Sequence, residues 1–340
     1  MMKSLVTGGG GFLGRYIVEA LQAQGHEVAV LCRGDYPFLR QQGVRLIQAD
    51  LADAPAVRQA CDGIERVFHV ASRTGPWGRY EDFHRTNVQG TRNLIEACQA
   101  AGVHKLIYTS SPSAVIGFDD LRGVNETCPY PTRPISAYQH TKMLAEQMVL
   151  SANGQQDLVT TALRPHAIWG PRDTQLLPAL IERHKAGKLV RVGTGENLIS
   201  VSYVENAASW HLQAADAAPA LAGGKVYFVN EPEPVNMWAW IDQLLASIGL
   251  PPVRKQASYR TAHALGALSE TVFTCLPWLG EPRLTRALAA VCAKDHYFDI
   301  TAAQCDLGLH SPVSMSEAHG RFASHFGAGA LSEERPCTIT

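Results

Sequence analysis

The stretch "LVTGGGGFLGRYIVEAL", residues 5–21, decides the fold. It opens on an apolar run that predicts a buried strand, and from residue 12 onward Leu13, Ile17 and Leu21 recur at helical spacing. Four consecutive glycines lie between the two, although glycine costs backbone entropy and cannot pack a core. Such a turn is either a flexible connection or a place where a ligand approaches the backbone closely.

The spacing of Gly8, Gly11 and Gly14 favours the ligand. In a strand–turn–helix unit the first glycine permits a tight turn, and the second lets a pyrophosphate touch the backbone. The third lets the helix pack closely on the strand, and the helix N-terminus faces the anion. We therefore predict a dinucleotide site formed by these glycines together with Phe12 and Leu13.

The same alternation of strand and helix continues through the first two thirds of the chain. Short apolar runs predict strands at residues 4–6, 27–31, 45–48, 66–70, 105–109 and 158–163. Longer segments with helical spacing predict helices at residues 12–24, 54–61, 80–101 and 136–151. This order predicts an α/β fold, a doubly wound parallel (Rossmann) sheet with helices on both faces.

After Pro165 the pattern becomes less regular. Strands are expected at residues 189–192 and 225–229, and helices at residues 176–186, 204–216 and 237–248. We expect residues 1–165 to form the dinucleotide-binding domain, with later segments such as 198–230 returning to it. Residues 166–325 would then form mainly a smaller, discontinuous C-terminal substrate lobe, and residues 326–340 a tail.

Composition excludes several classes of function. The 340 residues are 46% apolar and 18% charged, as in an ordinary globular protein, and a net charge of -1 gives no reason to expect a nucleic acid as partner. The eight cysteines stand singly without metal-ligand spacing, so we expect reduced thiols, a cytoplasmic location and no metal site. The chain enters a strand at once, so no signal peptide is expected. The longest apolar stretch, residues 262–279, is interrupted by His263, Glu270 and Pro277, so no transmembrane segment is expected.

A second motif, "AYQHTKMLAE", places Tyr138 and Lys142 four residues apart on one face of a predicted helix. An ammonium group beside a phenol stabilises the phenolate and lowers the tyrosine pKa. We therefore predict that Tyr138 is a general acid and base, activated by Lys142.

A third motif, "LIYTSSPSAVIG", ends a predicted strand in Thr109, Ser110 and Ser111. Ligands of doubly wound sheets bind at the carboxyl ends of the strands, so these hydroxyls should face the site. A serine there can donate a hydrogen bond to a substrate carbonyl, and either Ser110 or Ser111 could supply it.

Together these motifs resemble the extended short-chain dehydrogenase/reductase family, and more narrowly its 3β-hydroxysteroid dehydrogenase branch. The matching stretches are "TGGGGFLG", "ADLAD", "TNVQGTRNLIEAC", "YTSSPSAV", "AYQHTKMLAE" and "LRPHAIWGPRD". Within the branch, "RGDYPFLRQQGV", "GPWGRYEDFH" and "DHYFDI" resemble the bacterial 2-alkyl-3-oxoalkanoate reductases of long-chain olefin synthesis. "RPHAIWGPRD" also resembles the sterol-4-carboxylate 3-dehydrogenases.

The resemblance implies roles for individual residues. It implies a catalytic triad of Ser111, Tyr138 and Lys142, with Lys142 also reaching the nicotinamide ribose. It further implies a helix asparagine, Asn87, that shapes the site. The remaining positions that it implies in contact with the cofactor are Asp50 and Leu51 at the adenine, Ala71, and the segment from Pro165 to Ile168 at the nicotinamide.

One departure from the family pattern bears on the cofactor. Members that use NAD carry an acidic residue at the end of the second strand, where it binds the ribose hydroxyls. This chain reads "VLCRG" there, with Cys32 in place of the acid and Arg33 next to it. Because an arginine can pair with a 2′-phosphate, NADP is favoured over NAD; the alternative is a solvated surface charge.

We therefore expect an NADPH-dependent reductase of a hydrophobic 3-keto substrate, best a 2-alkyl-3-oxoalkanoate. The alternatives are a 3β-hydroxysteroid or sterol-4-carboxylate 3-dehydrogenase, a nucleotide-sugar epimerase, or a dinucleotide sensor without catalysis. Residues 262–279 should form an apolar tunnel or lid for the substrate. A substrate carboxylate needs a cation, for which Arg73, Arg79 and Arg172 are candidates. A homodimer, or an assembly with pathway enzymes, is a possible further association.

Overall fold

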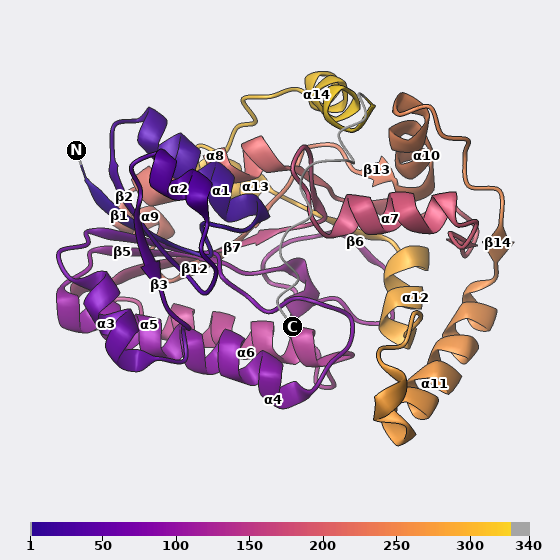
Figure 1. The fold of residues 1–340 in the computed structure, drawn as a ribbon, viewed down its shortest axis with the longest axis horizontal. Coiled ribbons are helices and arrows are strands. Elements are labelled where there is room, and N and C mark those ends of the chain that lie inside the picture. The colour runs from indigo at the N-terminus through magenta and orange to yellow at the C-terminus, as the bar shows by residue number, and fades with distance from the viewer. Residues whose placement is uncertain (1, 328–340) are drawn as a thin grey trace.

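The computed structural model describes residues 2–327, and a seven-stranded parallel sheet runs through its N-terminal two thirds (Figure 1). The strand order is β12-β7-β5-β4-β1-β2-β3, which confirms the predicted Rossmann sheet. The strands are β1 (Lys3–Thr7), β2 (Glu27–Cys32), β3 (Arg45–Gln48), β4 (Arg66–His69), β5 (Lys105–Thr109), β7 (Val159–Pro165) and β12 (Lys225–Val229). All of their pairings are parallel, and the order reverses direction between β1 and β4, where the ligand crevice of such sheets lies.

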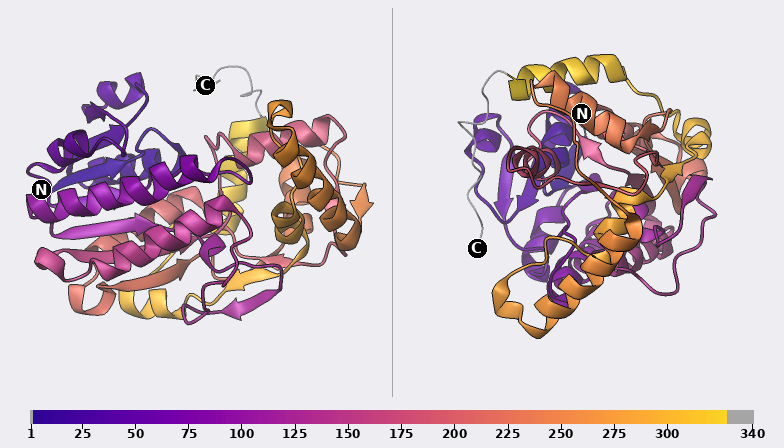
Figure 2. Two further views of the ribbon diagram at one scale, coloured as in Figure 1. Left: turned by 90° about the horizontal axis from the view of Figure 1, so that it is seen from below. Right: turned by 90° about the vertical axis from the view of Figure 1, so that its right-hand side faces the viewer.

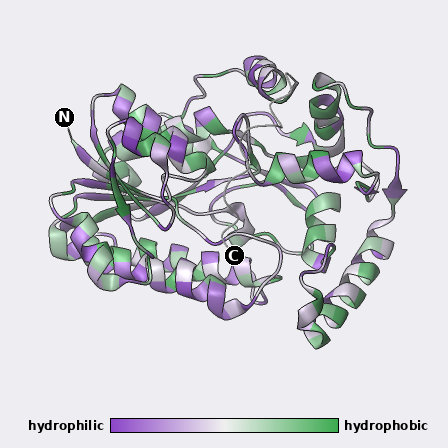
Figure 3. Cartoon of the chain, in the orientation of Figure 1, coloured by the Kyte–Doolittle hydropathy of each residue, from purple (hydrophilic) through white to green (hydrophobic). Residues whose placement is uncertain are grey.

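Helices cover both faces of this sheet, because its strands are apolar on both sides (Figures 2 and 3). One layer consists of α3 (Ala54–Cys61), α5 (Gly90–Ala101) and α6 (Ala137–Ser151). The other layer contains α1 (Phe12–Ala23), α8 (Val204–Asp216), α9 (Pro219–Ala222) and α13 (Thr301–Leu307), while α2 (Pro37–Gln41) precedes β3. Since β12 and α8 belong to this sandwich, the chain returns to it after residue 198.

The helix expected at residues 80–101 is present but is not a uniform α-helix. It runs as α4 (Tyr80–Phe83), a π-helical stretch (His84–Gln89) and α5. The wider turn carries Asn87, whose side chain bonds to backbone groups outside the helix. Such π-turns often accompany functional sites.

The second lobe is assembled from short segments that lie far apart in the sequence. A four-stranded sheet has the order β13 (Val235–Asn236), β10 (Leu198–Ile199), β15 (His296–Phe298) and β6 (Leu121–Val124). Two-stranded sheets pair β8 (Ile168–Trp169) with β11 (Ser202–Tyr203) and β9 (Arg191–Val192) with β14 (Gln256–Ala257). The helices here are α7 (Leu176–Lys185), α10 (Met237–Ser247), α11 (Tyr259–Cys275), α12 (Arg286–Ala293) and α14 (Met315–Gly327).

The apolar segment at residues 262–279 forms most of α11 and the short 3₁₀ turn Pro277–Leu279 that follows it. Figure 2 shows this helix projecting from the body of the molecule, and it packs against α12. No helix within residues 2–327 is long and apolar enough to cross a membrane. At the other end of the lobe, Phe326 and Gly327 close α14 and Phe326 is buried, whereas the rest of the predicted tail lies outside the described residues.

Candidate active site

The glycine turn between β1 and α1 is as tight as its sequence predicts. Gly8 has a φ of 72°, and a Cβ there would lie 2.9 Å from the backbone of Ala71 on β4. A Cβ on Gly14 would lie 2.2 Å from the carbonyl oxygen of Gly8. The first glycine therefore serves a left-handed turn and the third a close approach of helix to turn. Phe12, Leu13 and Gly14, the first residues of α1, line the opening beside the turn, and the N–H groups of a first helical turn have no partner within the helix.

Thr7 joins the turn to the next strand. Its hydroxyl accepts hydrogen bonds from the backbone N–H groups of Val70 and Ala71, both at 3.2 Å. The buried His69 lies between the hydroxyls of Thr7, at 2.8 Å, and Thr91, at 2.9 Å. Burial lowers the pKa of His69 to about 3, so the imidazole stays neutral and links the two threonine hydroxyls by hydrogen bonds.

The end of β2 carries no carboxylate toward the opening. Burial raises the pKa of Cys32 to about 11, so its thiol stays protonated. Arg33 is exposed, and its guanidinium makes no hydrogen bond or ion pair with any residue of the described chain. Tyr36, which the sequence analysis did not single out, lies over the turn, with its ring where side chains on Gly10 and Gly34 would be.

Two serines follow β5 at the carboxyl edge of the sheet. Ser111 caps a 3₁₀ turn, and its Oγ accepts the backbone N–H of Ser113 at 3.2 Å. Ser110 is buried, and its hydroxyl has no partner within the described protein. Ser111 is the one whose hydroxyl acts on the phenol of Tyr138, where it lowers the tyrosine pKa.

Tyr138 and Lys142 lie on α6, which begins where Ser136 caps the backbone N–H of Gln139. The Nζ atom of Lys142 donates a hydrogen bond of 2.7 Å to the carbonyl oxygen of Thr109 and lies 4.2 Å from the ring centre of Tyr108. The lysine is only 2% exposed, and burial lowers its pKa to about 7. Lys142 is thus held against the end of β5 and shielded from solvent.

The expectation that Lys142 lowers the pKa of Tyr138 is wrong for this structure. Burial raises the tyrosine pKa, and the opposing influences come from the hydroxyls of Ser111 and Ser113. The physical reason is the position of the ammonium group, which bonds the Thr109 carbonyl, together with its own reduced pKa. The protein alone therefore keeps Tyr138 protonated, in the form of an acid that can donate.

The residues predicted for the catalytic triad and for contact with the cofactor line one cleft, whose volume is about 680 Å³. Asn87, which was predicted to shape the site, is buried and does not line it. The cleft extends from the end of β2, past the glycine turn, to the ends of β5 and β7. The predicted residues that line it are Gly8, Gly11, Phe12, Leu13, Gly14, Arg33, Asp50, Leu51, Ala71, Ser111, Tyr138, Lys142, Pro165 and Ile168. The topology thus brings together side chains that are spread over nearly half of the sequence, from Gly8 to Ile168.

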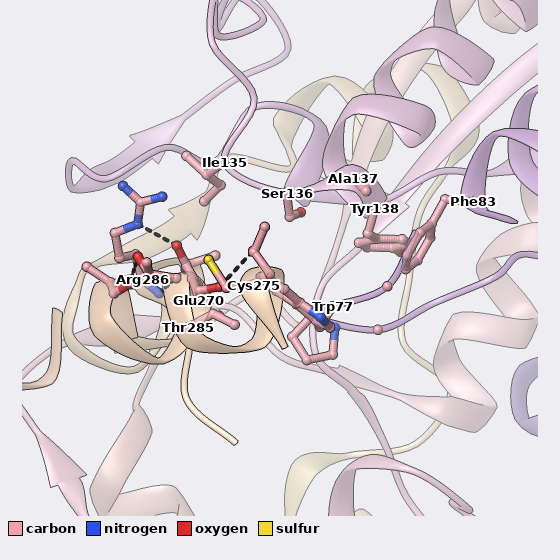
Figure 4. A pocket seen from close by; sticks show the side chains of 17 residues that line it. Trp77, Phe83, Ile135, Ser136, Ala137, Tyr138, Glu270, Cys275, Thr285 and Arg286 are labelled. Atoms are coloured by element: carbon pink, nitrogen blue, oxygen red, sulfur yellow. Dashed lines mark hydrogen bonds and ion pairs between the residues drawn. The ribbon is translucent and has the colours of Figure 1, made fainter. Parts of the chain in front are cut away.

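A second cleft, of about 490 Å³, meets the first at Tyr138, which lines both. Figure 4 shows Tyr138 and Phe83 on one side of it and Glu270, Cys275 and Arg286 on the other. The α11 helix forms this second wall with Ala267, Glu270, Thr271, Thr274 and Cys275. The expectation of an apolar tunnel or lid is wrong in this respect, because the large apolar side chains of the helix, Leu265, Leu268 and Val272, are exposed and line neither cleft. Sequence analysis missed Glu270 and Arg286, which form an ion pair of 2.6 Å in this wall.

Of the three arginines expected near the substrate, only Arg73 lines either cleft. Arg172 is bound by Glu19 at 2.7 and 2.8 Å and lies over the ring of Tyr16. Arg79 points into solvent with 79% of its side chain exposed. Within residues 2–327, no group of three or more His, Cys, Asp or Glu side chains could hold a metal ion, and the seven described cysteines are free.

Comparison with known proteins agrees with this arrangement. Residues 5–258 match the family described as the 3-beta hydroxysteroid dehydrogenase/isomerase family. A 2-alkyl-3-oxoalkanoate reductase of Stenotrophomonas maltophilia is 42% identical over 338 residues, covering 96% of this chain and 100% of the relative. The decarboxylating sterol-4-alpha-carboxylate 3-dehydrogenase of Mus musculus is 35% identical over 335 residues, covering 95% of this chain and 91% of the relative.

Among solved structures, the UDP-glucose 4-epimerase of Thermus thermophilus, in complex with NAD, has the same fold. Its TM-score is 0.74 at 22% identity, and the match covers 96% of this chain and 100% of the epimerase. The shared fold therefore extends over nearly the whole of both chains.

Proposed function

We propose that this chain reduces 2-alkyl-3-oxoalkanoates with NADPH. The chain belongs to the 3-beta hydroxysteroid dehydrogenase/isomerase family and is an NAD(P)-dependent oxidoreductase that acts on hydroxyl and keto groups. The observation that carries the proposal is the position of Tyr138 where the two clefts meet. One cleft has the features of a dinucleotide site, and the other offers room for a second molecule.

The residues of the first cleft fit a dinucleotide. The turn is closed to side chains at Gly8 and Gly14, and the N–H groups of the first helical turn, at Phe12 and Leu13, are available to a pyrophosphate. Asp50 and Leu51 border the end expected to take the adenine, and Arg33 supplies an unpaired cation for a 2′-phosphate. When bound, the cofactor supplies a hydride to the ketone carbon of the substrate.

The side chains of this chain then handle the proton and the orientation. Tyr138, held protonated by burial, donates its proton to the ketone oxygen. Ser111 lies beside that phenol and orients the same oxygen with its hydroxyl. Lys142, which is hydrogen-bonded to the Thr109 carbonyl, also lines this cleft and would contact the ribose of the cofactor. The neighbouring Ser110, also in the cleft, is the alternative hydroxyl.

The second cleft supports an acyl substrate. Trp77, Phe83, Ile135 and Ala137 border it on the side of Tyr138. The opposite side carries the small residues Ala267, Thr271 and Thr274 together with the Glu270–Arg286 ion pair. The apolar side chains on the wall of Tyr138 suit the alkyl chains of an acyl substrate. The sterol-carboxylate relatives favour a second candidate, a 3-hydroxysteroid carboxylate, whose reacting carbon also lies near a carboxylate.

The test is an assay of NADPH oxidation with 3-keto acids of increasing chain length, a 3-ketosteroid and a nucleotide sugar. We expect kcat/KM to rise by up to a few-fold per methylene, since burying one is worth about 0.8 kcal/mol, and then to level off. Tyr138→Phe should lower turnover by about 10²–10⁴-fold while NADPH affinity stays within a few-fold. A flat dependence on chain length, or faster turnover of the sugar, would refute the proposal.

A further inference from the structure

Arg73 brings a positive charge to the border between the two clefts. It lines the cofactor cleft, and its Nη2 atom lies 3.8 Å from the Cβ position of Gly78, a residue of the substrate cleft. Its guanidinium lies 5.3 Å from the ring centre of Phe83, whose ring is 6.4 Å from that of Tyr138. The cation is therefore separated from the proton donor by a single aromatic ring.

The backbone of Arg73 is fixed relative to the catalytic helix by Asn87. The side-chain oxygen of Asn87 accepts the Arg73 N–H at 2.7 Å, and its amide nitrogen donates to the Arg73 carbonyl at 3.0 Å. The same nitrogen donates to the hydroxyl of Thr141 at 3.1 Å, and that hydroxyl donates to the carbonyl of Tyr138 at 3.0 Å. Asn87 is 2% exposed, so solvent does not compete with these bonds.

The charge of Arg73 is available to a ligand. Within the described chain its ion pair is with Asp82, at 3.7 Å, and both side chains are about half exposed, at 41% and 48%. Such a loose surface pair contributes little. By contrast, Arg286 across the substrate cleft is held by Glu270 through its backbone N–H and its Nε, each at 2.6 Å.

We propose that Arg73 binds the carboxylate of the substrate and so selects 3-oxo acids over neutral ketones. This inference rests on the proposed function. In a 3-oxo acid the carboxylate is attached one carbon from the ketone, so it must lie close to Tyr138 when that residue donates its proton. The guanidinium beside Phe83 is only loosely paired, whereas Lys142 is held by the Thr109 carbonyl and Arg286 by Glu270. Arginine also matches a carboxylate with two parallel hydrogen bonds.

The test compares a 2-alkyl-3-hydroxyalkanoate with its methyl ester, both oxidised with NADP⁺ by the full-length protein. The hydroxy acid is used because, unlike the 3-oxo acid, it does not decarboxylate during the assay. The readout is the acid-to-ester ratio of kcat/KM. Arg73→Gln should lower this ratio by about 10- to 100-fold, because a hydrogen bond to a charged group is worth about 1.5–3 kcal/mol. Arg79→Gln, an exposed arginine outside both clefts, should keep the wild-type ratio.

Other outcomes overturn the inference. A ratio lowered by Arg286→Gln but not by Arg73→Gln would assign the carboxylate to the opposite wall. Equal losses for acid and ester in Arg73→Gln, with a raised KM for NADP⁺, would assign Arg73 to the cofactor. If the wild type oxidises both compounds and Arg73→Gln leaves the ratio unchanged, the role of Arg73 fails while the proposed function stands. If the wild type oxidises neither but turns over a steroid or sugar, both fail.

Discussion

Gly14→Ala is the substitution for which the structure gives the sharpest expectation. The new methyl group would lie 2.2 Å from the carbonyl oxygen of Gly8, 2.8 Å from its carbonyl carbon and 2.9 Å from the Cα of Gly9. All three atoms belong to the backbone, so no side chain can rotate away. Either α1 must move outward or the turn must open.

The magnitude follows from two opposing contributions. Overpacking costs about 1–3 kcal/mol, and alanine in place of a helical glycine returns about 0.5–1 kcal/mol. We therefore expect the free energy of unfolding to fall by about 1–2 kcal/mol. The same displacement would move the N–H groups that face the pyrophosphate, and losing one charge-assisted hydrogen bond would raise the Kd for NADPH by about 10- to 100-fold.

Gly320→Ala is the matched control, because Gly320 is also helical but has open space around its Cβ position. It should stabilise the protein by up to about 1 kcal/mol and leave the Kd unchanged. Urea unfolding gives the first quantity and a fluorescence titration with NADPH the second. If Gly14→Ala binds NADPH and unfolds as the wild type does, the glycine turn does not act as argued.

Three further predictions concern charge. Arg33→Ala should lower the NADPH-to-NADH ratio of kcat/KM at least about tenfold, and a wild type that prefers NADH, or an unchanged ratio, would exclude contact with the 2′-phosphate. In the folded protein the pKa of Lys142 is about 7, below its ordinary value of 10.5, so the unfolded chain binds more protons between those two pH values. The buried lysine therefore destabilises the fold fully below pH 7 and no longer does so near pH 10.5. Relative to Lys142→Met, the cofactor-free wild type should therefore gain up to about 1.4 kcal/mol of unfolding free energy per pH unit in that window, and equal slopes would contradict the burial of a charged lysine. Glu146→Ala should lower the free energy of unfolding in urea by about 3–5 kcal/mol, because it leaves Arg164 buried without its ion-pair partner; Arg164 is 2% exposed and bonded to Glu146 at 2.6 and 2.9 Å. The control Glu27→Gln, in an exposed ion pair, should cost under about 1 kcal/mol. Similar losses for the two variants would refute the reasoning.

The cofactor half of the fold could be predicted because its signals are local. Each strand of the large sheet is a short apolar run between turn residues, and the crossovers that follow β1, β3 and β4 carry helices with an apolar stripe, α1, α3 and α5. The helix at residues 80–101 was predicted as continuous, and its π-helical turn was missed. Backbone hydrogen-bond register does not alter the pattern of apolar residues, so no periodicity could indicate it.

The second lobe could not be predicted in the same way. Its four-stranded sheet pairs Leu121–Val124 with His296–Phe298, and pairs Leu198–Ile199 with Val235–Asn236. Strands of two to four residues are too short to show alternation, and their partners lie far away in the sequence. Helices α11, α12 and α14 were also not predicted, although residues 262–279 were singled out as apolar. The homodimer, the assembly with pathway enzymes and the cytoplasmic location stay predictions.

The catalytic residues could likewise be predicted where local geometry decides their positions, but not where a contact with a distant backbone atom decides their charge. Spacing alone placed Tyr138 and Lys142 on one helix face, and the end of β5 supplied Ser111 nearby, because both follow from local geometry. The pKa relation between Tyr138 and Lys142 was wrong, since it depends on where the ammonium group finds its hydrogen bond. That partner, the Thr109 carbonyl, is a backbone atom and leaves no trace in the residue pattern.

The position of the substrate cleft explains how one scaffold serves several reactions. The wall that carries Tyr138 belongs to the predictable half of the chain, whereas the opposite wall is α11 and the start of α12. Helix α11 projects from the body (Figure 2) and packs mainly against α12, so its sequence can change without disturbing the cofactor site. Arg73 lies on the side of Tyr138, just after β4, and Asn87 links its backbone to Thr141 of α6. If Arg73 fixes the carboxylate while α11 accommodates the alkyl chains, then substitutions in α11 should alter the preference for chain length without altering the acid-to-ester ratio of kcat/KM.

Ala267→Leu, which adds bulk to the wall facing Tyr138, should therefore shift the optimum of the homologous series to shorter acids and leave that ratio as in the wild type. A change in the ratio together with the optimum would mean that one surface performs both tasks, and the division of labour argued here would not hold.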